Sequence, residues 1–164
     1  MKVLVSDTSV LIDLERGGFL EAAFSLSWEL AVPDLLYENE LHNHGGERLT
    51  ALGLIVAELA PDEIIAALNY RRQQAALSLA DTFALSLAAS RAWTLLTGDG
   101  RLRDLARSEQ VSCHGVLWML DQLHEVKAIP AGALHSGLTT IATHPRCCLP
   151  KKDIAVRLER FCVA

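Results

Sequence analysis

The sequence predicts an α/β fold, a three-layer α/β/α sandwich around a mostly parallel central sheet. Short apolar runs alternate with longer amphipathic segments along the chain, as strands alternate with helices in parallel sheets. Of the 164 residues, 51% are hydrophobic and 21% are charged, so the chain can bury a sizeable core without disulfides. The chain shows no linker, low-complexity tract or internal repeat. We therefore expect one domain spanning residues 1–164, with residues 126–164 as a C-terminal helical extension.

Three strands and four helices are predicted in the first half of the chain. The strands are apolar runs: KVLVSD (2–7), WELAVP (28–33) and LGLIVAEL (52–59). The helices begin near capping residues or prolines: SVLIDLERGG (9–18), FLEAAFSL (19–26), LLYENELHN (35–43) and PDEIIAALNYRRQQA (61–75). Asp34 is expected to cap the third of these helices, and HGG (44–46) to break it.

The second half continues the alternation with two strands and five helices. The strands are WTLLT (93–97) and VSCHG (111–115). The helices are TFALSLAASR (82–91), LRDLARSEQ (102–110), VLWMLDQLHEV (116–126), AGALHSGLTTIA (131–142) and KKDIAVRLERF (151–161). Ser78 and Asp81 resemble a capping box ahead of the first of these helices. Trp93, Leu117 and Trp118 are expected in the core, with a dimer interface as the alternative.

Four acidic residues lie where predicted strands are followed by helices: Asp7, Glu40, Asp81 and Asp99. A carboxylate beside a buried apolar run is costly unless a positive charge accompanies it. Asp7 and Asp99 follow strands directly, and ligands of parallel sheets bind outside the carboxyl ends of the strands. We therefore expect the four carboxylates to form one site for Mg²⁺ or Mn²⁺, which prefer oxygen ligands.

Each acid also has a purely local explanation. Asp81 fits a capping box, Asp99 suits a tight turn between two glycines, and Asp7 could cap the first helix. Glu40 could be a solvated helix residue, and Glu38 is the alternative choice for the second acid. Together these explanations require four independent coincidences near one edge of the sheet, and this favours a shared site.

The sequence resembles the PIN-domain family, which includes the VapC-type ribonuclease toxins of bacterial and archaeal toxin–antitoxin pairs. The resemblance rests on the order and spacing of four segments: VSDTSVLI (5–12), VPDLLYENEL (32–41), LSLADTFALSLA (77–88) and WTLLTGDGRLRDLA (93–106). It covers residues 1–125 well and residues 126–164 only loosely. Each segment alone is short, and it is the shared order and strand-end setting that make the match specific.

The resemblance implies metal-dependent hydrolysis of phosphodiester bonds in single-stranded RNA. It makes Asp7, Asp81 and Asp99 metal-binding and catalytic residues, with Glu40 as the helical acid because Leu41 completes the Glu-Leu pattern of the family. One or two Mg²⁺ or Mn²⁺ ions can activate a water molecule and offset charge on the phosphorus and on the leaving oxygen. The implied enzyme is therefore an endoribonuclease.

Other residues beside the acids have supporting roles by the same resemblance. The small hydroxyl residue after the first Asp corresponds to Thr8 or Ser9, and Thr97 precedes the last acid as a Thr or Ser often does in the family. Many family members have a more basic face near the site, whereas this chain has scattered arginines. Arg101 and Arg103 are possible contacts for RNA phosphates, with solvated helix charges as the alternative.

Two other classes of protein that have an Asp at a strand end do not fit this sequence. A haloacid-dehalogenase-type phosphotransferase would need a second Asp two residues after Asp7, where Ser9 stands. A phospho-receiver domain would need an acidic pair after the first strand and a Lys at a later strand end. The remaining alternative is a catalytically silent PIN fold that serves as an interaction or regulatory module.

The resemblance further implies an RNA substrate, a small antitoxin protein as partner, and a homodimer. The net charge of −5 does not indicate bulk electrostatic binding of nucleic acid, although bound cations would reverse the sign near the acids. No apolar run approaches the roughly 18 residues of a membrane span, and the N-terminus lacks a secretory signal. We therefore expect a cytoplasmic protein without a membrane partner.

The cysteines fit this expectation. Cys147 and Cys148 are adjacent, and the chain has no C-x-x-C spacing, so neither a zinc knuckle nor a secreted disulfide framework is indicated.

Overall fold

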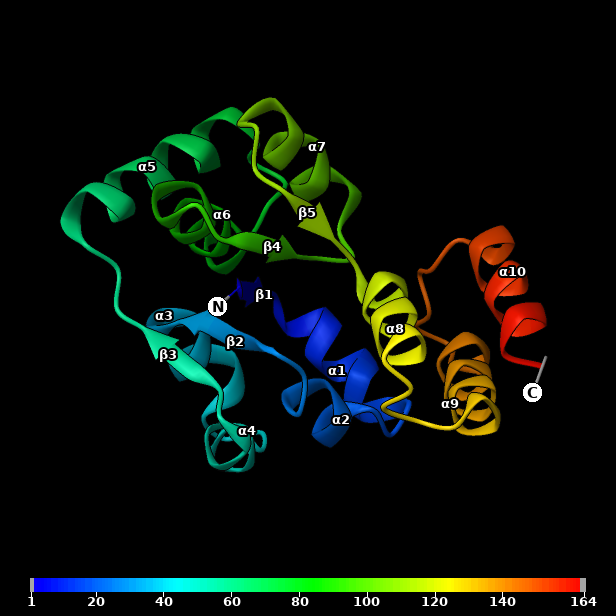
Figure 1. Ribbon diagram of the computed structural model, residues 1–164. Helices are drawn as coiled ribbons and strands as arrows, with labels where there is room; N and C mark the ends of the chain where they lie inside the picture. The colour runs from blue at the N-terminus through cyan, green and yellow to red at the C-terminus, as the bar shows by residue number, and fades with distance from the viewer. Residues whose placement is uncertain (1, 163–164) are drawn as a thin grey trace.

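The structure, a computed structural model, describes residues 2–162. In this part of the chain a five-stranded sheet has the order β3-β2-β1-β4-β5, and every strand pair is parallel (Figure 1). The strands are β1 (Lys2–Ser6), β2 (Trp28–Pro33), β3 (Ile55–Ala57), β4 (Thr94–Leu96) and β5 (Cys113–His114). The predicted α/β sandwich with a parallel sheet is confirmed.

The helices follow the predicted alternation closely. They are α1 (Thr8–Arg16), α2 (Leu20–Phe24), α3 (Asp34–Leu36), α4 (Gly46–Leu52), α5 (Pro61–Gln73), α6 (Leu79–Arg91), α7 (Gly100–Ser108), α8 (Val116–Glu125), α9 (Ala131–Thr143) and α10 (Lys151–Cys162). Among the described residues, every helix is too short or too polar to cross a membrane.

The sheet separates two hydrophobic clusters, as successive residues of β1 show. Leu4 belongs to the main cluster with α1, α2 and α8–α10, whereas Val5 belongs to the second cluster with α5, α6 and α7. Neighbouring side chains of a strand point to opposite faces, so this central strand contributes to both. The two clusters correspond to the two helical layers on either side of the sheet in Figure 1.

The register brings the ends of β1 and β4 together. Ser6 pairs with Leu96, and the backbone N–H of Asp7 donates to the Leu96 carbonyl over 3.0 Å. Asp7 and Thr97 are therefore the first residues beyond two adjacent parallel strands, at the edge where ligands of such sheets bind.

The segment between β2 and β3 differs from the prediction. Pro33, not Asp34, is the N-cap, and the helix passes after one turn into a π-helical turn, η1 (Tyr37–Leu41). The helix ends at Leu41, before the HGG sequence, and α4, which was not predicted, already begins at Gly46. Gly45 has φ +88°, which favours glycine, and reverses the chain so that Leu49 of α4 reaches the main cluster.

The tryptophans and Leu117 pack as expected for core residues. Leu117 belongs to the main cluster, and the half-buried Trp118 packs against it. Trp93 packs against the second cluster. Trp118 stacks on both Trp28 and His114, with ring centres 5.5 and 4.1 Å away.

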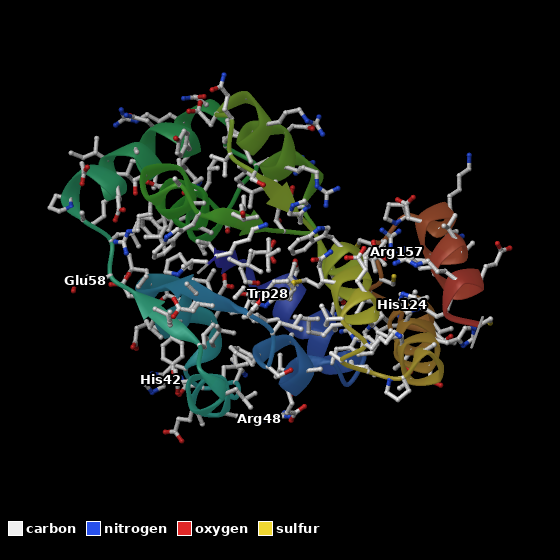
Figure 2. All side chains as sticks on the ribbon, in the orientation of Figure 1. Trp28, His42, Arg48, Glu58, His124 and Arg157 are labelled. Carbon is white, nitrogen blue, oxygen red and sulfur yellow. The ribbon has the colours of Figure 1, made fainter. Side chains whose placement is uncertain are left out.

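The C-terminal helices share the main cluster. Leu138 and Ile141 of α9 and Phe161 of α10 are at most 1% exposed within it. Arg157 of α10 also binds Asp121 of α8 with two guanidinium nitrogens, Nε at 3.0 Å and Nη2 at 2.6 Å (Figure 2). Burial and this bidentate ion pair fix α10 against α8.

Candidate functional site

Asp7 stands at the carboxyl end of β1 with both carboxylate oxygens occupied. Its Oδ1 accepts hydrogen bonds from the Val10 backbone N–H at 3.0 Å and from the Ser9 hydroxyl at 2.8 Å. Its Oδ2 accepts a hydrogen bond from the Thr97 hydroxyl. Asp7 is therefore the N-cap of α1, one of its predicted local roles, and its side chain is held both by α1 and by Thr97 at the end of β4.

The surroundings of Asp7 disfavour its ionised form in the metal-free protein. The residue is only 4% exposed, and this burial raises the pKa of its carboxyl group above the usual 3.8. The bonds from Thr97, Val10 and Ser9 act in the opposite direction, while the charge of Asp81 raises the pKa further. A cation bound at this edge would offset both the burial and the repulsion.

Thr97 connects Asp7 to Asp99. The Thr97 hydroxyl, fully buried, donates to Asp7 and accepts the backbone N–H of Asp99 over 3.0 Å. Asp99 in turn caps α7 by accepting the N–H groups of Arg101 at 2.8 Å and Leu102 at 3.2 Å on its Oδ1. One hydroxyl thus sets the positions of two acids from neighbouring strands.

The other two acids come from helices. In η1 the Oε2 atom of Glu40 accepts the hydroxyl of Thr8, the first residue of α1. Glu38 is exposed and pairs with His42 at 3.4 Å, so the structure brings Glu40 rather than Glu38 to α1. π-Helical turns occur often at functional sites, and this one aims Glu40 at the same end of the sheet.

Asp81 forms the capping box of α6. Its N–H donates to the Ser78 hydroxyl, and its Oδ2 accepts the Ser78 N–H, both over 3.1 Å. Asp81 therefore caps α6, as its local explanation predicts. Its negative charge also raises the pKa of Asp7. One carboxylate can serve both as a helix cap and as a site residue, because its second oxygen stays available.

The donor set fits a hard divalent cation that keeps part of its water shell. Within residues 2–162, Asp81 Oδ1, Asp99 Oδ2 and Glu40 Oε1 accept no hydrogen bond. No group of three or more His, Cys, Asp or Glu side chains in this range is close enough to enclose an ion. Mg²⁺ is usually held by one or two carboxylates, waters and substrate phosphates, so a closed cage is not required.

A groove opens beside Asp99. It has a volume of about 680 Å³ and lies between α1, the loop from β4 to α7, and the loop from α9 to α10. A second hollow of about 560 Å³ shares Gly98 and Gly100 with it and extends toward His114. Of the four acids, Asp99 lines the groove, whereas Glu40 lines a separate hollow with Thr8.

The predicted arginine contacts have different surroundings. Arg101 is exposed and lines the groove. Arg103 is half-buried and donates to the Thr97 carbonyl over 3.1 Å, so its guanidinium supports the backbone of the site. Arg146, from the loop between α9 and α10, also lines the groove. Arg146 was not predicted as a site residue because it lies far along the chain from the four motifs.

Comparisons with known proteins give one family match and a similar fold. A model of DUF3368, described as a PIN domain, matches residues 3–159. A solved structure with a similar fold is a PilT N-terminus domain protein, SSO1118, from the hyperthermophilic archaeon Sulfolobus solfataricus P2. The TM-score is 0.51 at 12% sequence identity, over 74% of this chain and 92% of that one. No functionally curated protein matches the sequence.

Proposed function

Because the chain belongs to the PIN-domain family, we propose that it is a Mg²⁺- or Mn²⁺-dependent endoribonuclease acting on single-stranded RNA. PIN domains are generally nucleases and generally use divalent metal ions. The observation that carries the proposal is the buried carboxylate of Asp7, fixed by Thr97 and next to the charge of Asp81. A buried carboxylate at a sheet edge, with a second negative charge acting on it, favours a bound cation.

The residues of this chain would hold the metal and keep the site ordered. A bound divalent ion supplies an activated water molecule and offsets negative charge on the phosphate. Asp7 and Asp99 would hold it, with Glu40 and Asp81 orienting its waters. Thr97 keeps Asp7 in place before substrate arrives, so little reorganisation is needed during the reaction.

The first experiment is a calorimetric titration of Mn²⁺ into wild type, Asp7→Asn and Asp99→Asn. We expect binding to wild type and its loss in both variants, followed by Mn²⁺-dependent cleavage of single-stranded RNA by wild type alone. Asn remains a good N-cap, so Asp99→Asn should retain the fold. Metal binding without cleavage of any tested RNA would instead indicate the catalytically silent interaction module.

For the biological role, we propose the toxin of a cytoplasmic toxin–antitoxin pair, with a small antitoxin protein as its partner and a homodimer as its assembly. The similarity of the four motifs to VapC-type toxins supports this role. Induced expression of wild type should arrest bacterial growth, whereas Asp99→Asn should not. Normal growth with soluble, RNA-cleaving wild type would favour a role in RNA processing.

A further inference from the structure

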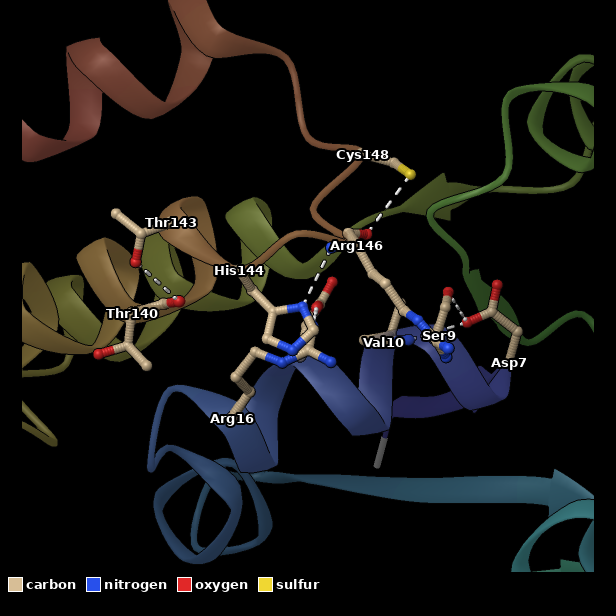
Figure 3. A network of polar contacts seen from close by, with 10 residues as sticks. Asp7, Ser9, Val10, Arg16, Thr140, Thr143, His144, Arg146 and Cys148 are labelled. Carbon is tan, nitrogen blue, oxygen red and sulfur yellow. Dashed lines mark hydrogen bonds and ion pairs between the residues drawn. The ribbon is translucent and has the colours of Figure 1, made fainter.

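The loop between α9 and α10 forms a wall of the groove opposite the metal-binding edge. Arg146 in this loop lines the same groove as Ser9 and Asp99. In Figure 3 its side chain extends from the loop toward Ser9 and Asp7 at the start of α1. A residue from the loop between α9 and α10 thus lines the same groove as the first turn of α1.

The backbone of this loop is held in a defined turn. The Arg146 N–H donates to Nδ1 of His144 over 3.1 Å, and the Cys147 N–H donates to the His144 carbonyl over 3.0 Å. Cys147 and Leu149 pack against the main hydrophobic cluster on either side of the exposed Cys148. The turn therefore presents Arg146 to the groove from an anchored backbone, at a low cost in conformational entropy.

Of the charged side chains that line the groove, Asp13, Arg16 and Asp104 form ion pairs, whereas Asp99, Arg101 and Arg146 form none within residues 2–162. Arg16 pairs with Asp13 at 3.2 Å, and Asp104 pairs with Arg107 at 3.5 Å. Arg101 and Arg146 form no ion pair within residues 2–162, and both are exposed to the groove. They come from different elements, with Asp99 lining the groove as well. Two free guanidinium groups beside a carboxylate proposed to bind the metal suit a backbone phosphate next to the reacting phosphodiester.

We propose that Arg146, with Arg101, binds a backbone phosphate of the substrate strand next to the scissile one, so that the α9–α10 loop forms part of the RNA-binding surface. The inference rests on the proposed ribonuclease function and adds a substrate contact to it. Arginine suits this task because its planar fork can donate two hydrogen bonds to one phosphate. Such a contact positions the strand without reading its sequence.

The test is fluorescence anisotropy with a short, labelled single-stranded RNA of mixed sequence, in EDTA so that metal-dependent cleavage is suppressed. Arg146→Gln should weaken binding about threefold to tenfold and reduce the slope of log Kd against log salt by about 0.7. Arg146→Lys should keep most of the slope because it keeps the charge. The matched control is Arg72→Gln, an exposed residue of α5, which lies in the helical layer on the other face of the sheet from α9 and α10 (Figure 1).

Three results would overturn the inference: wild type that does not bind the RNA, Arg146→Gln with wild-type affinity and salt slope, or an equal loss in Arg72→Gln. A Mn²⁺ titration tests the proposed function independently of the role of Arg146, since Arg146→Gln should bind Mn²⁺ as wild type does. Failure of wild type to bind Mn²⁺ would contradict the metal-dependent reaction, and the anisotropy comparison would still decide the role of Arg146.

Discussion

Gly137 of α9 lies directly against the backbone of Gly17 at the end of α1. A Cβ atom on Gly137 would overlap the Gly17 carbonyl oxygen and the ring of Phe19, which is 1% exposed. A Cβ on Gly17 would in turn lie 2.9 Å from Cδ1 of Ile141. This close approach sets the distance between α9 and α1, and with it the position of the loop that carries Arg146.

Gly137→Ala is therefore expected to destabilise the protein by about 1–3 kcal/mol, because the added methyl group has no space. Urea unfolding would measure the change. Gly132→Ala is the matched control, since a Cβ at this other glycine of α9 meets nothing within 4 Å. We expect the control to be as stable as wild type or slightly more so. Equal stability of both variants would contradict the tight contact.

Glu63→Gln should also lower stability, by about 1–3 kcal/mol at neutral pH. Glu63 is buried at the start of α5 and accepts hydrogen bonds from Arg91 Nε and Nη2 of α6, both at 3.0 Å. The Arg91 bond lowers the pKa of Glu63 from 4.5 to about 2. The stabilisation is thus complete above pH 4.5 and is lost as pH falls toward about 2.

Chemical unfolding of wild type and Glu63→Gln across this pH range would test the interpretation. The difference in free energy of unfolding between wild type and Glu63→Gln should become smaller as the pH falls. Glu109→Gln is the control, because exposed Glu109 makes a longer, 3.3 Å bond to Tyr70. A difference that stays constant with pH would show that the carboxylate charge is not the cause.

Asp7→Asn should raise the stability of the metal-free protein, whereas Glu63→Gln should lower it. The folded state holds the Asp7 proton more tightly than the unfolded chain does, because burial raises its pKa. Wild type should therefore lose stability as pH rises from 3.8 through the raised pKa, and the variant should lack this loss. In EDTA at neutral pH, we expect Asp7→Asn to melt at a higher temperature than wild type.

With added Mn²⁺, wild type should melt at a higher temperature than Asp7→Asn. The ion would bind the folded wild type and stabilise it by mass action. Thermal unfolding of both proteins in EDTA and in Mn²⁺ would measure the effect. An equal rise in melting temperature for the two proteins would place the metal elsewhere.

Thr97→Val should lower the affinity for Mn²⁺ about tenfold, since it removes the hydroxyl that orients Asp7 and accepts the Asp99 N–H. Calorimetry would measure the affinity, and Thr97→Ser should restore most of it. Thr94→Val provides a control at a buried threonine of β4, the strand that Thr97 follows. Similar losses in the two valine variants would point to a general effect of a buried hydroxyl.

The parts of the fold predicted well are those with local causes. The apolar run before Asp7 and the Ser78–Asp81 capping box determine their elements within a few residues of sequence. The positions of Asp7 and Asp99 at strand ends followed from the same reasoning. The missed helix α4 depends on a tertiary contact, the burial of Leu49, and its sequence alone begins with glycine.

The contacts within the site were less predictable because they join distant segments. The choice of Glu40 over Glu38 depends on a π-helical turn and on the hydroxyl of Thr8. Arg103 follows the last acid as closely as Arg101 does, yet it is bound to the Thr97 carbonyl. Arg146 reaches the groove only through the packing of α9 on α1. Sequence spacing carries no information on such partners.

The burial of Phe161 has a consequence for synthesis of the protein. This side chain fills the main cluster from α10, beside residues such as Leu14 that a ribosome produces earlier. A growing chain therefore lacks part of its core, and the position of the α9–α10 loop is not fixed, until α10 has been made. For the ribonuclease proposed above, this order of events would keep the groove incomplete while the first four motifs are already synthesised.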